Sequence, residues 1–154
     1  MTKANPNETS RGPVWVWWAL TVAIAGWLLW MTQRPQAVVS AELTALTESA
    51  EARGISRHLL ISILGNIAVF IPLGASASGA LAHHPRLRAR AFWGGGLIGV
   101  GLSGVIELLQ LFSASRFADL QDLGLNALGA FAGAGVGVWL VHILRSKSRQ
   151  RPTE

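Results

Sequence analysis

Carboxylate and amide side chains occur in the second half of this sequence within and beside runs that are otherwise apolar. Glu107 and Gln110 lie three residues apart, and Asp119, Asp122 and Asn126 follow at intervals of three and four. Residues at these intervals share one face of an α-helix, so each set presents its polar groups together. Carboxylates can transfer protons, and carboxylates with amides can bind a polar ligand. The spacing therefore predicts an acid–base site or a binding site.

Three further residues extend this group. Asn66 lies in an earlier apolar run, Ser103 precedes Glu107 by four residues, and Arg116 lies between the two sets. A guanidinium group forms paired hydrogen bonds with carboxylates, so Arg116 can pair with any of the three acids. An alternative is that the whole group only ties helices together. The candidate ligand-binding residues are Asn66, Glu107, Gln110, Arg116, Asp119, Asp122 and Asn126, and the candidates for acid–base catalysis are Glu107 and Asp122.

Four apolar runs must position these side chains, and each is close to the ~20 residues that cross a bilayer. They cover residues 14–31, 59–82, 91–112 and 123–144. The chain has 154 residues, of which 51 % are hydrophobic and 14 % charged, whereas a soluble domain carries about 25 % charged residues. This composition excludes a disordered chain and an ordinary soluble domain. It predicts an all-α, integral membrane bundle of four transmembrane helices.

Basic residues alternate between the two sides of this bundle. The two tails and the connection over residues 83–90 hold nine of the 13 Lys and Arg residues, so the positive-inside rule predicts both termini to be cytoplasmic. Counted from the ends of their runs, Asn66, Glu107 and Asn126 then lie in the outer leaflet. The net charge of +5 sets orientation, and we expect no nucleic-acid partner.

The expected organisation follows from these runs. The first run is long for a signal peptide, so we expect it to remain as an anchor in a multi-pass protein of the cell membrane. The outer loop fits either an interfacial helix or a solvated linker. The segments are a cytoplasmic tail (1–13), the first transmembrane helix (14–31), the outer loop (32–57), a membrane domain of three helices (58–144) and a basic cytoplasmic tail (145–154).

Glycine and proline add structural expectations. Glycines recur every four residues at Gly95 and Gly99, and again from Gly129 onward. This spacing allows close helix packing within one chain, and a homodimer face is the alternative. Pro72 is predicted to kink the second run. Pro72, Gly74 and Gly129 are therefore assigned structural roles.

The sequence lacks the residues and motifs that several kinds of catalysis and metal binding require. The sequence has no cysteine and no nucleophile-elbow, HExxH or P-loop motif. We therefore expect no cofactor. Hard cations take carboxylate oxygens, which would suit Glu107, Asp119 and Asp122, but the leading prediction has no metal.

The polar residues form one pattern across three runs: Asn66-x3-Phe70-x-Pro72-x-Gly74, Ile106-Glu107-x2-Gln110, and Arg116-x2-Asp119-x2-Asp122-x3-Asn126-x2-Gly129. This pattern, over roughly residues 58–141, resembles the VanZ-like family of small bacterial membrane proteins. The resemblance implies a cell-envelope protein with four or five spans, in a family named after a member linked to teicoplanin resistance. It leaves the biochemical activity open.

Three functions remain open at this point. The first is binding of a membrane lipid or lipid-linked cell-wall precursor through its headgroup at the outer leaflet, with a link to glycopeptide resistance. The second is an enzyme that acts on a lipid-linked substrate with Glu107 or Asp122 as acid or base. The third is a small ion-coupled transporter that uses Glu107. The residues do not decide whether the protein is an enzyme.

Overall fold

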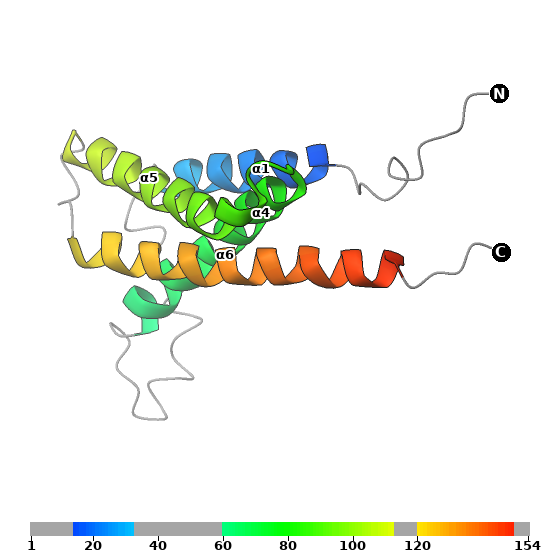
Figure 1. The fold of residues 1–154 in the computed structure, drawn as a ribbon. Coiled ribbons are helices and arrows are strands. Elements are labelled where there is room, and N and C mark those ends of the chain that lie inside the picture. The colour runs from blue at the N-terminus through cyan, green and yellow to red at the C-terminus, as the bar shows by residue number, and fades with distance from the viewer. Residues whose placement is uncertain (1–13, 33–59, 113–119, 150–154) are drawn as a thin grey trace, which may run out of the picture.

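The computed structural model describes residues 14–32, 60–112 and 120–149 (Figure 1). Within these ranges every regular element is a helix. The four long helices are α1 (Val14–Thr32), α4 (Asn66–His83), α5 (Ala91–Leu111) and α6 (Leu120–Arg149). All four are long and apolar enough to cross a membrane. The all-helical fold with four candidate spans is therefore confirmed, while the side on which the termini lie stays a prediction.

Two short helical segments lead into the second and third spans. A π-helix over Leu60–Gly65 runs directly into α4, and a 3-10 turn over Arg88–Arg90 precedes α5. Helix α4 continues through Pro72, whose ring lies on an exposed face of the helix. Proline has no N–H group, so the carbonyl of Ala68 loses its usual partner at that point.

Helices α4 and α6 make the most extensive contact in the bundle. A Cβ atom added to Gly129, Gly133 or Gly137 of α6 would overlap a backbone carbonyl of α4. In the reverse direction, a Cβ atom on Gly74 would overlap the carbonyl of Ala130. Small residues are needed where two helix backbones touch, because any larger side chain would force them apart. The four-residue spacing thus corresponds to direct backbone contact inside the chain.

Helix α5 packs across this pair, again through glycine. A Cβ atom on Gly95 would collide with Ser78 of α4, and one on Gly99 would collide with the methyl group of Ala130 in α6. These glycines are therefore covered within one chain, and a homodimer stays a prediction. The buried core beside them consists of Leu28, Phe70, Leu73, Ile106 and Ala130.

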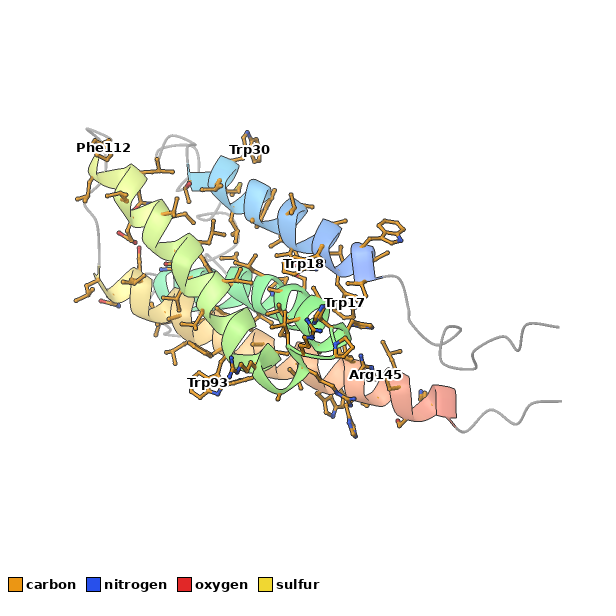
Figure 2. All side chains as sticks on the ribbon, turned by 45° about the horizontal axis from the view of Figure 1, so that its top comes forward. Trp17, Trp18, Trp30, Trp93, Phe112 and Arg145 are labelled. Atoms are coloured by element: carbon orange, nitrogen blue, oxygen red, sulfur yellow. The ribbon has the colours of Figure 1, made fainter. Side chains whose placement is uncertain are left out.

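Helix α1 is attached more loosely. It packs mainly on α4 and buries only Thr21 and Leu28. Its Trp17 ring covers Gly79 and lies 5.9 Å from the ring of His83, between centroids. The start of α1, the end of α4 and the last part of α6 consequently lie at one end of the bundle, as Figures 1 and 2 show.

The outer surface of the bundle is apolar. Six of the seven tryptophans are exposed, and large aliphatic side chains such as Leu20, Leu97 and Leu128 are exposed on α1, α5 and α6. In water such a surface would be unfavourable, but in a bilayer it faces acyl chains. The surface therefore agrees with a protein that lies in the membrane.

Two sequence expectations concern the ends of the spans. Helix α6 runs on to Arg149, so residues 145–149 of the expected C-terminal tail are helical. Of the expected outer loop over residues 32–57, only Thr32 is described, and it is the last residue of α1. The interfacial helix expected within this loop lies outside the described residues.

Candidate functional site

Asn66 and Asp122 connect α4 to α6 at the end of the bundle away from Arg145. Asn66 is the first residue of α4, and Asp122 lies in the first turn of α6. The Nδ2 group of Asn66 donates a hydrogen bond to Oδ1 of Asp122. A carboxylate acceptor makes such a bond stronger than one between neutral groups. Two residues that are 56 positions apart in the sequence are thereby held together.

One turn further along α6, Asn126 makes a second interhelical bond. Its Nδ2 group donates to Oγ of Ser103 in α5 at 2.8 Å. Ser103 is fully buried and Asn126 is 5 % exposed. In the part of the chain that the structure describes, Oδ1 of Asn126 is buried with no hydrogen-bond partner. Buried polar atoms rarely lack a partner, so this oxygen is the most unusual atom of the site.

Glu107 and Gln110 lie on the same face of α5 as Ser103. They follow it by four and seven residues, which is the spacing of neighbours along one helix face. Ser103 faces α6, because it bonds Asn126. Both Glu107 and Gln110 are half-buried. This face of α5 therefore carries polar groups from the level of Asn126 toward the end where α6 begins.

A family model described as VanZ/LLP1 matches residues 14–144. The chain belongs to the VanZ/LLP1 family. The match includes α1, whereas the resemblance read from the polar residues begins near residue 58. Searches of curated proteins and of solved structures found no match.

The site residues predicted for this VanZ/LLP1 protein fall into two groups, namely those that the structure describes and those that lie outside the described residues. The structure brings Asn66, Asp122 and Asn126 together from α4 and α6, and α5 adds Glu107 and Gln110 on the face that meets α6. Arg116 and Asp119 lie outside the described residues, so the pairing of Arg116 with an acid stays a prediction.

Sequence reasoning placed Ser103 on the polar face but left it out of the binding residues. In the structure it is the hydrogen-bond partner of Asn126. Its spacing of four from Glu107 is the signal that could have included it. Serine is common on the packed faces of membrane helices, which makes that signal weak on its own.

The three carboxylates that would suit a hard cation are Glu107, Asp119 and Asp122. Residues 14–32, 60–112 and 120–149 contain no group of three or more His, Asp or Glu side chains that could hold an ion. Asp119, one of the three carboxylates, lies outside these ranges.

The described part of the site is rich in acceptors. Asp122 offers carboxylate oxygens and Asn126 offers its amide oxygen, while both amide Nδ2 groups donate within the protein. Acceptors of this kind bind hydroxyl, amide or ammonium groups. Close to the apolar bilayer such bonds are stronger than in water, because less solvent competes for the same groups.

Proposed function

We propose that this VanZ/LLP1 protein binds the polar headgroup of a membrane lipid or lipid-linked cell-wall precursor between α4, α5 and α6. The observation that carries the proposal is the buried, unpartnered Oδ1 atom of Asn126. A buried acceptor without a partner costs about 1–3 kcal/mol. A hydroxyl or ammonium group of a ligand would remove that cost.

A purely structural role explains the two interhelical bonds but not this oxygen. Interhelical hydrogen bonds stabilise a membrane bundle by about 0.6–2 kcal/mol each. A serine–asparagine pair that leaves one acceptor buried and unsatisfied loses much of that gain. The pair is therefore a poor choice for stability alone, and a binding role accounts better for the asparagine.

The chemistry of the ligand follows from the groups that meet it. Asp122 and Asn126 present acceptors, so they suit a headgroup with hydroxyl, amide or amine donors. Arg116, through its predicted place in the connection between α5 and α6, supplies a donor for a phosphate. Together they fit a phosphate-bearing headgroup that also carries a sugar or an amine. In the orientation predicted from the basic residues, this end of the bundle meets the outer leaflet.

The experiment is complementation of a deletion strain, with envelope-lipid composition and teicoplanin sensitivity as readouts. Asn126→Leu removes the free acceptor and should fail to restore the wild-type profile at normal membrane levels. Ser78→Ala is the matched control, because Ser78 is also fully buried and bonds across to Ala134 of α6, but away from the site. This control should restore the profile.

Two results would contradict the proposal. Full complementation by Asn126→Leu would remove the amide from any binding role. Failure of Ser78→Ala and Asn126→Leu alike, at normal membrane levels, would show that loss of any buried polar contact is enough. A further arm with Arg116→Ala tests that side chain separately, since an unchanged profile would exclude Arg116 from the site.

A further inference from the structure

A hollow lies at the end of the bundle opposite this site, where α4 ends and α5 begins. Its volume is about 480 Å³. Apolar residues form most of its wall, including Pro85 of the turn and Val138 and Val141 of α6. Arg88 and His142 are the members of the lining that can carry positive charge. The hollow thus combines an apolar wall with a cationic rim.

The surroundings of the hollow are strongly basic. Arg86, Arg88 and Arg90 are exposed on the turn between α4 and α5. Arg145 of α6 donates through Nη2 to the carbonyl of Ala82 at 2.9 Å, which places its guanidinium beside the end of α4. Positive charge therefore comes to this end from two separate parts of the chain.

Negative charge lies elsewhere in the described structure. Glu107 and Asp122 are the two carboxylates in the described ranges, and both belong to the site at the other end. No carboxylate among the described residues therefore competes for the cationic groups around the hollow. An anion that approaches this end meets attraction from several arginines.

We propose that this hollow binds an anionic phospholipid, with the lipid phosphate on Arg88 and His142. Guanidinium groups bind phosphate through paired hydrogen bonds, and basic pockets between membrane helices suit anionic headgroups. The valines of α6 decide between a lipid and a free anion. The valines offer no favourable apolar contact to a soluble phosphate, whereas the first methylenes of the acyl chains of a lipid gain from burial against them. In the predicted orientation this lipid belongs to the inner leaflet.

The test measures thermal unfolding of the full-length protein in a neutral detergent while lipid is added. Phosphatidylglycerol should raise the unfolding midpoint in a concentration-dependent way, because a ligand that binds the folded state stabilises it. Phosphatidylcholine at the same concentration, and soluble glycerol phosphate, should leave the midpoint unchanged. Native mass spectrometry of the same samples should show phosphatidylglycerol retained by the wild-type protein.

Arg88→Gln and Arg86→Gln form the matched pair of variants. Both remove one positive charge from the same exposed turn, but only Arg88 lines the hollow. Arg88→Gln should weaken the lipid effect by about tenfold or more, since bonds to charged groups contribute strongly. Arg86→Gln should retain it. Ala89→Glu places a carboxylate in the same lining and should abolish the stabilisation by phosphatidylglycerol. It replaces Arg88→Gln as the test variant if Arg88→Gln is produced poorly.

The following results would overturn the proposal. An equal response to glycerol phosphate means a site for soluble anions. Equal losses in the Arg86 and Arg88 variants mean general attraction to a basic surface. No response of the wild-type protein to phosphatidylglycerol, or an unchanged response in Ala89→Glu, means that the hollow holds no such lipid.

Discussion

Replacing Gly133 by alanine should destabilise the contact between α4 and α6, whereas the same replacement at Gly124 of the same helix should not. A Cβ atom on Gly133 would overlap the carbonyl oxygen of Ile71 and lie 2.7 Å from its carbonyl carbon. Ordinary van der Waals contact begins at 3.4 Å. The carbonyl oxygen is closer still, so the two backbones must separate at this point, because a carbonyl held in a helix cannot turn away.

The expected magnitude combines two opposing effects. Overpacking a tight interface costs about 1–3 kcal/mol, and alanine recovers up to about 1 kcal/mol through its better helix propensity. We expect Gly133→Ala to lower the free energy of unfolding by about 1–2 kcal/mol. A Cβ atom on Gly124 meets nothing within 4 Å. Gly124→Ala should thus be neutral or stabilising by up to about 1 kcal/mol.

The assay is reversible unfolding in mixed micelles with increasing dodecyl sulfate, followed by far-ultraviolet circular dichroism. Both variants have the same composition, so their difference isolates the position of the added methyl group. If Gly133→Ala proved as stable as Gly124→Ala, the backbones of α4 and α6 would not be in contact. The arrangement of the polar site on those two helices would then be wrong.

Three further predictions concern polar groups at the two ends of the bundle. Alanine substitutions at Asn66 and Asp122, singly and together, should give a coupling of about 0.6–1.7 kcal/mol in the same assay, and purely additive effects would exclude their bond. Glu107→Gln should keep the complementing activity if the protein binds a headgroup, whereas complete loss at normal membrane levels supports an acid–base enzyme. Arg145→Gln should cost about 1–2 kcal/mol through its bond to the end of α4, whereas Lys147→Gln, at an exposed position, should cost nothing measurable.

Composition and run length were enough to predict the four helices, because a bilayer demands about 20 apolar residues for each crossing. The interval of four between glycines predicted close packing as well. The residues that these glycines contact could not be predicted, because the spacing defines a helix face but not which residues of the neighbouring helix lie opposite it. That Gly129 meets Ile67, or that Gly95 meets Ser78, depends on how α4 is rotated and shifted relative to its neighbours.

The same limit applies to the candidate site. Helix periodicity put Ser103 and Glu107 on one face, but the bond from Asn126 to Ser103 requires the depths of α5 and α6 to match. Arg145 counted in the sequence only as a charge near the membrane, yet in the structure it bonds the last turn of α4. Long side chains at helix ends reach several partners, and only the packed bundle selects one of them.

Cross-linking in native membranes tests the convergence of α5 and α6 most directly. The chain has no cysteine, so Ser103→Cys with Asn126→Cys gives one defined pair for a short bifunctional thiol reagent. Trypsin then cleaves after Arg116, the only Lys or Arg between Arg90 and Arg145, and separates the two helices unless they are cross-linked. The control pairs Ser103→Cys with Leu128→Cys, whose position is 62 % exposed on another face of α6. The structure predicts joined peptides for the first pair and separate peptides for the control. Separate peptides for both pairs would show that Ser103 and Asn126 do not meet and that the site does not exist.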